Sequence, residues 1–150
     1  MKIIFAGSPQ AAKITLEYLF EQQTASGFEI AGVLSNPPTA KGRHKTPTPT
    51  PVAAYALEKR LPVFTPEHLD AGAREQIAPL GADLLVCFAY GHIFGPKFLA
   101  LFPMGGINLH PSFLPKYRGC TPVQQAILDG EEYLGISIQT LSLKMDAGDI

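Results

Sequence analysis

Short apolar runs alternate along the chain with segments in which apolar residues recur every three or four positions. The short runs are typical of buried strands, and the longer period is typical of amphipathic helices. The predicted strands are residues 2–6, 28–34, 62–65, 83–89, 105–110 and 135–141. The predicted helices are residues 9–23, with Ser8 as the cap, and residues 52–59, 67–78, 96–102 and 122–130, with Thr121 as the cap of the last.

This alternation predicts a parallel sheet, because each helix returns the chain to start the next strand in the same direction. The expected fold class is α/β: a Rossmann-like three-layer domain with a mostly parallel sheet and helices on both faces. Residues 83–89 are almost continuously apolar, as expected of a central strand covered on both sides. Apolar and polar residues alternate only loosely in the predicted strand at 135–141, and both parallel and antiparallel pairing are open for it.

Two polar side chains end the predicted strand at residues 105–110. Asn108 and His110 are two positions apart, so on a strand they point to the same face. Pro111 and Pro115 then stop the ladder, because proline has no N–H and fixes φ. An amide beside an imidazole suits a site that stabilises an oxyanion and handles a proton. A strand end whose Asn and His bind only loop backbone is an equal alternative at this point.

A carboxylate from the acidic turn at residues 146–149 is the third candidate group, because a carboxylate next to an imidazole fixes its tautomer. No nucleophile completes a hydrolase, since Ser112 follows a proline and no Gly-x-Ser-x-Gly elbow exists. Group transfer between two bound substrates therefore fits better than covalent hydrolysis. His110 and Asp146 lack the paired spacing of metal ligands, so no metal is expected.

The segment at residues 35–51 differs from the rest because it contains five prolines, no acids and a basic cluster at Lys41, Gly42, Arg43 and Lys45. We expect a long loop without secondary structure, which either clamps phosphates or is a solvated surface loop. The total charge of −1 does not itself call for a nucleic-acid partner. Since no apolar run is long enough for a signal peptide or a membrane span, a cytoplasmic location is expected.

Four segments together resemble the formyltransferase family that uses 10-formyltetrahydrofolate. They are Asn108-Leu109-His110-Pro111-Ser112, Leu114-Pro115-Lys116-Tyr117-Arg118-Gly119, Pro122-Val123-Gln124-Gln125-Ala126-Ile127 and Asp146-Ala147-Gly148-Asp149. The resemblance covers all 150 residues and is strongest to the branch that formylates initiator methionyl-tRNA. That branch is matched by Gly7-Ser8-Pro9, the basic loop, residues 47–52 and Ala89-Tyr90-Gly91.

The resemblance implies a role for each matching position. Asn108 and His110 would polarise the formyl group and stabilise the oxyanion, and Asp146 would keep His110 in its working state and move a proton through water. The folate donor, 10-formyltetrahydrofolate, would be held by Tyr90, Gly91, His92, Ile93, Phe94, Ser112, Leu114 and Pro115. The initiator tRNA would be met by Lys41, Gly42, Arg43 and Lys45.

The implied function is formyl transfer to the α-amino group of initiator methionyl-tRNA by a monomer. Residues 1–150 would be an N-terminal catalytic domain, incomplete at its C-terminus because Ile150 resembles the start of another strand, and without the family's C-terminal tRNA-binding β-barrel domain. One alternative is a formyltransferase for a small amine, such as glycinamide ribonucleotide or an amino-sugar nucleotide, since Pro111 is more typical of those relatives. Another is a truncated, non-catalytic folate-binding module. A dinucleotide-dependent oxidoreductase is more distant, because the glycine fingerprint is missing.

Overall fold

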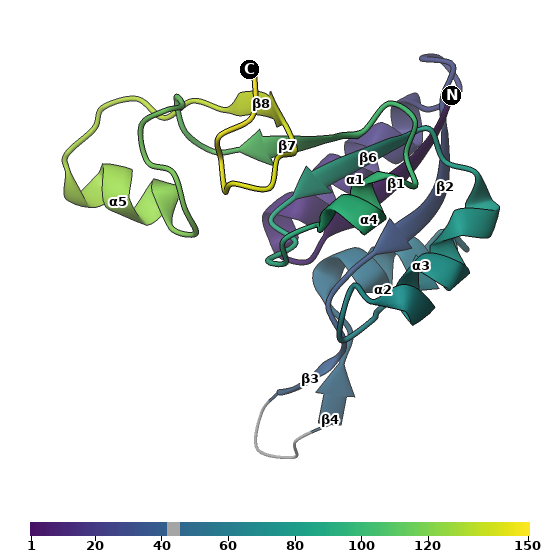
Figure 1. Ribbon diagram of the computed structural model, residues 1–150. Coiled ribbons are helices and arrows are strands. Elements are labelled where there is room, and N and C mark those ends of the chain that lie inside the picture. The colour runs from purple at the N-terminus through teal and green to yellow at the C-terminus, as the bar shows by residue number, and fades with distance from the viewer. Residues whose placement is uncertain (42–45) are drawn as a thin grey trace.

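The computed structural model describes residues 1–41 and 46–150, apart from the side chain of Lys41 (Figure 1). A six-stranded sheet has the order β5-β2-β1-β6-β7-β8; its first five strands are parallel and β8 is antiparallel to β7. The α/β class and the mostly parallel sheet are therefore confirmed. The strands of this sheet are β1 (Lys2–Gly7), β2 (Glu29–Leu34), β5 (Val63–Phe64), β6 (Leu84–Phe88), β7 (Gly106–His110) and β8 (Ser137–Thr140).

Helices cover both faces of the sheet, as predicted. Alternate residues of β1 belong to different cores: Ile3 and Phe5 pack in one cluster, and Ile4 and Ala6 pack in the other. The first cluster includes residues of α1 and α2, and the second includes residues of α3 and α4. The helices are α1 (Gln10–Gln22), α2 (Pro51–Glu58), α3 (Ala71–Ile77), the 3-10 turn η1 (Ala78–Leu80), α4 (Pro96–Leu99) and α5 (Pro122–Leu128).

Some predicted helix boundaries are wrong for identifiable reasons. Ser8 does not cap α1; the helix starts at Gln10, and the Ser8 hydroxyl instead accepts the Asn36 N–H at 3.1 Å, which ties the end of β1 to the end of β2. Helix α3 begins at Ala71 rather than 67 because the Asp70 carboxylate caps it. Helix α4 ends at Leu99, three residues earlier than predicted. Thr121 occupies the cap position of α5 without a side-chain capping bond.

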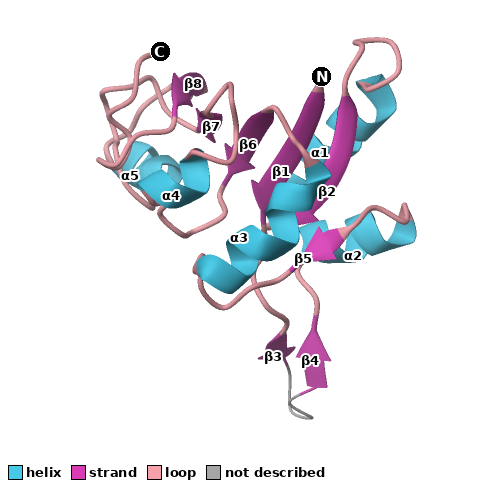
Figure 2. Cartoon of the chain, turned by 45° about the vertical axis from the view of Figure 1, so that its right-hand side comes forward, coloured by secondary structure: helices cyan, strands magenta, loops and turns pink. Residues whose placement is uncertain are grey.

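The prediction that the proline-rich segment at 35–51 has no secondary structure is wrong. Strands β3 (Thr39–Lys41) and β4 (Thr46–Thr48) pair antiparallel and project from the rest of the molecule (Figure 2). A two-stranded ribbon leaves one edge of each strand unpaired, so a proline such as Pro47 can be accommodated in it. The predicted tRNA contacts Gly42, Arg43 and Lys45 lie outside the described residues, and so does the Lys41 side chain.

Candidate active site

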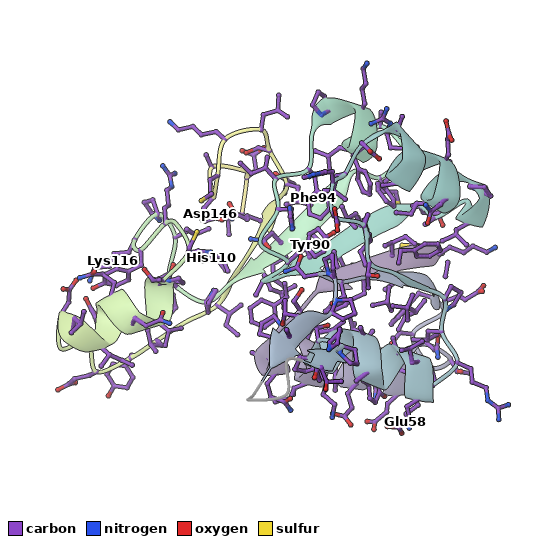
Figure 3. The ribbon with its side chains drawn as sticks, turned by 90° about the horizontal axis from the view of Figure 1, so that it is seen from below. Glu58, Tyr90, Phe94, His110, Lys116 and Asp146 are labelled. Atoms are coloured by element: carbon purple, nitrogen blue, oxygen red, sulfur yellow. The ribbon has the colours of Figure 1, made fainter. Side chains whose placement is uncertain are left out.

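The structure brings the three predicted catalytic side chains to one place. Asn108 and His110 lie on β7, and Asp146 lies in the loop that follows β8 (Figure 3). The His110 Nδ1 atom is 3.5 Å from Asp146 Oδ1, and the two side chains are only 6% and 9% exposed. This convergence supports the prediction that the acid comes from the turn at 146–149.

Two groups that the sequence did not indicate hold the Asp146 carboxylate. The Gly119 N–H donates to Oδ2 at 2.8 Å, and Gln139 Nε2 donates to Oδ1 at 2.9 Å. Asp146 has φ +49, in the left-handed region. Because that conformation is uncommon for a residue other than glycine, tertiary bonds of this kind are needed to keep it. Gln139 also lies opposite Asn108 in the β7–β8 register, which places both side chains on the same face of the sheet.

The other ring nitrogen of His110, Nε2, is hydrogen-bonded to the backbone. Nε2 lies 2.8 Å from the carbonyl oxygen of Tyr117, and since a carbonyl only accepts, Nε2 carries a proton. Nδ1 is therefore the nitrogen that faces Asp146. The Tyr117 hydroxyl donates to Glu131 at 2.7 Å, and hydrogen bonds from Lys116 and Tyr117 lower the pKa of that carboxyl. These contacts fix the loop that presents the carbonyl to His110.

A cavity of about 390 Å³ opens at the carboxyl ends of β6 and β7, the edge at which α/β sheets usually bind ligands. Its wall contains all three catalytic candidates and residues 90–94, the predicted folate segment. Apolar groups such as Phe88, Leu109 and Met145 form much of the remaining wall. An apolar slot with a few convergent polar groups suits a flat heteroaromatic ligand.

The other three predicted folate residues, Ser112, Leu114 and Pro115, do not line this cavity. The buried Ser112 hydroxyl donates to the Lys116 carbonyl at 2.6 Å, and the Leu114 N–H donates to Ser137 Oγ at 3.0 Å. The structure therefore places Ser112 and Leu114 where they shape the loop between β7 and α5.

Within the predicted folate segment, the two end residues have different surroundings from the three residues between them. Tyr90 and Phe94 are buried and stack with ring centroids 5.4 Å apart (Figure 3). Gly91, His92 and Ile93 are exposed. Burial, followed by proximity to Cys87, raises the pKa of Tyr90 to about 12. The aromatic pair anchors the segment, so the exposed residues are the ones available to a ligand.

The two cysteines in the cavity wall should differ sharply in reactivity. Burial, with a smaller contribution from the charge of Asp146, raises the pKa of the Cys87 thiol to about 12, whereas Cys120 is exposed. Because the thiolate is the nucleophile, we expect iodoacetamide near neutral pH to modify Cys120 and to spare Cys87 until unfolding. Peptide mapping by mass spectrometry measures this, and early labelling of Cys87 would contradict the burial described above.

The described residues contain no group of three or more His, Cys, Asp or Glu side chains that could hold a metal ion. Over the same residues, no helix is both long enough and apolar enough to cross a membrane.

Comparison with known proteins shows the family to which the chain belongs. The family model described as formyl transferase matches residues 1–150. The chain belongs to the formyl transferase family. The family resemblance seen in the sequence is therefore confirmed.

Similar formyl transferases come from several bacteria. The chain is 46% identical over 158 residues to a methionyl-tRNA formyltransferase of Treponema denticola, and 44% identical over 151 residues to one of Roseiflexus castenholzii. Both matches cover 100% of this chain, and they cover 48% and 47% of the relatives. The chain thus spans about half the length of the curated relatives it matches.

Solved structures confirm the fold. A phosphoribosylglycinamide formyltransferase from Bacillus halodurans superposes with a TM-score of 0.78 at 22% identity, covering 100% of this chain and 76% of that one. A formyltetrahydrofolate deformylase from Pseudomonas syringae gives 0.74 at 22% identity, covering 98% of this chain and 48% of that one. At these identities the formyl transferase fold is what the chains share.

Proposed function

We propose that the protein containing this chain transfers a formyl group from 10-formyltetrahydrofolate to the α-amino group of initiator methionyl-tRNA, in support of translation initiation. The observation that carries the proposal is the grouping of Asn108, His110 and Asp146 in the wall of one cavity. The identity to proteins named methionyl-tRNA formyltransferase supports the choice of acceptor.

Formyl transfer requires the stabilisation of a developing negative charge and the movement of a proton, and these residues can supply both. When the neutral amine attacks the formyl carbon, negative charge develops on the carbonyl oxygen, and fixed hydrogen-bond donors stabilise it. The Asn108 amide is one donor in this proposal. His110 Nδ1 is the second donor when the imidazole is protonated, because the Nε2 proton is already donated to the Tyr117 carbonyl. The bond between the formyl carbon and N10 of the folate must then break, the attacking nitrogen must lose a proton and N10 must gain one. Asp146 lies beside His110 to move this proton.

Positioning of the reacting groups contributes in addition to charge stabilisation. The aromatic anchor of Tyr90 and Phe94 fixes one side of the cavity, and β7 fixes the other. Donors held this way need little reorganisation during the reaction, which is why preorganised sites are effective. The cavity wall therefore acts as a rigid frame for two substrates.

The test compares acceptors with the complete gene product that contains residues 1–150. We expect 10-formyltetrahydrofolate to formylate methionyl-tRNA much faster than glycinamide ribonucleotide, measured by acid-gel separation of the charged tRNA and by release of tetrahydrofolate. Equal or faster formylation of glycinamide ribonucleotide would contradict the proposed tRNA acceptor and indicate a small amine as the acceptor. Folate binding without transfer to either acceptor would indicate a binding module.

A further inference from the structure

Gln139 occupies an unusual position on β8. The inward-facing residues of this strand are polar, Ser137 and Gln139, whereas Ile138 faces solvent. A strand packed on a core normally shows the reverse pattern, with apolar residues inward. Since Gln139 is only 3% exposed, its polarity is not explained by contact with water.

The orientation of the Gln139 amide is determined by its partner. Its NH₂ group faces Asp146 Oδ1 at 2.9 Å, because a carboxylate oxygen accepts and the amide oxygen cannot donate. The amide oxygen Oε1 then points elsewhere, and it is buried without a hydrogen-bond partner among the described residues. An unsatisfied buried acceptor destabilises a fold, so this side chain is not optimal for stability.

His110 alone does not fix the Asp146 carboxylate. The distance of 3.5 Å between Nδ1 and Oδ1 exceeds the roughly 2.7–2.9 Å of a charge-assisted N–H···O bond. Asp146 lies in a turn outside the strands and helices, so the backbone ladder does not hold its side chain either. Gln139 is the side chain that holds the same oxygen that faces His110, and Gly119 holds the other oxygen.

We propose that Gln139 is a positioning residue for the transfer reaction: it holds the Asp146 carboxylate against His110. This inference rests on the proposed formyl transfer. It predicts a loss of kcat without a matching change in KM, which a purely structural role would not produce.

The first test is Gln139→Met in the complete gene product, since methionine keeps the length of the side chain and removes both the donor and the unpaired oxygen. We expect kcat to fall by about tenfold to a hundredfold, as the loss of one hydrogen bond to a charged group predicts. The KM values for folate and for methionyl-tRNA should change little, because the rest of the cavity wall is intact. Circular dichroism checks that the variant is folded in the assay. An unchanged kcat, or a loss that falls on KM and not on kcat, would overturn the proposal.

The second test is Gln139→Glu, which keeps the shape but replaces the donor by a second carboxylate next to Asp146. Because a neighbouring carboxylate raises the pKa of a carboxyl, the introduced group should take up a proton as the pH falls and then donate it to Oδ1. The ratio of variant kcat to wild-type kcat should therefore rise toward low pH; a ratio independent of pH would contradict the proposal. The wild-type pH profile is the reference for the titratable groups common to both proteins, which in the cavity wall are Cys87, Tyr90, His92, His110, Cys120 and Asp146.

Gln125 offers a matched control. Its Nε2 donates to Asp129 Oδ1 at 2.8 Å at the exposed C-terminal end of α5, so Gln125→Met removes the same kind of bond outside the cavity wall. This variant should keep wild-type kcat, and an equal loss in both variants would overturn the proposal. The wild-type protein in the same assay distinguishes the proposed function from the proposed role of Gln139. If the wild-type protein transfers no formyl group, the proposed function is refuted. If the wild-type protein is active and Gln139→Met is equally active, only the role of Gln139 is refuted.

Discussion

Replacing Asn108 by alanine is expected to lower kcat for formyl transfer by about a hundredfold to a thousandfold, the usual effect of removing one oxyanion donor. The reason is that the amide contributes to a charge that exists only after the amine has attacked. Folate binding should change little, because the apolar wall and residues 90–94 remain in place. Steady-state kinetics with 10-formyltetrahydrofolate and methionyl-tRNA, together with a folate-binding titration, measure the two effects separately.

The control for this variant is Asn108→Asp, which keeps the shape but replaces the amide donor by an acceptor. If donation to the oxyanion is the function of Asn108, the aspartate variant should be at least as impaired as the alanine variant. Retained activity in either variant would remove Asn108 from the catalytic set. Both variants should fold, since Asn108 is only half-buried at the end of β7.

Asp146→Asn is expected to have the larger effect, a loss of about a thousandfold or more in kcat, as for other carboxylates that orient a catalytic imidazole. The Gly119 N–H and Gln139 Nε2 both donate to the present carboxylate. Asparagine has one acceptor oxygen, so one of these donors would face an NH₂ group. The variant would also lose the negative charge beside His110, and single-turnover kinetics would show the slowed chemical step directly.

Asp149 gives a matched control within the same turn. Its side chain is exposed, and its contacts with Thr140 are made by backbone atoms, so Asp149→Asn removes a charge without removing a bond. Near-normal kcat is expected for this variant. A comparable loss at both positions would mean that the charge of the whole turn, and not the position of Asp146, supports the reaction.

The features that the sequence did not predict have different causes. Ser8 matches the pattern of a helix cap, but its hydroxyl accepts the N–H of Asn36, which follows β2 and is 28 residues away. Local propensity contains no information about so distant a partner. The pairing of β3 with β4 is local, and it was missed because the prolines of this segment suggested an irregular loop.

The sequence by itself determined the order along the chain of the helices and of the six strands of the main sheet, its mostly parallel pairing, and the placement of Asn108 and His110 on one face of β7. These features follow from the periods of the hydrophobic pattern and from alternation along a strand. Only the tertiary structure decided how Asp146 is held, because its partner Gly119 is 27 residues away and Gln139 comes from the neighbouring strand. It also decided the tautomer of His110, since the Tyr117 carbonyl belongs to a loop whose path depends on contacts with Glu131. Hydrogen bonds between such distant segments form only after the sheet has brought them together, so no local pattern can specify them.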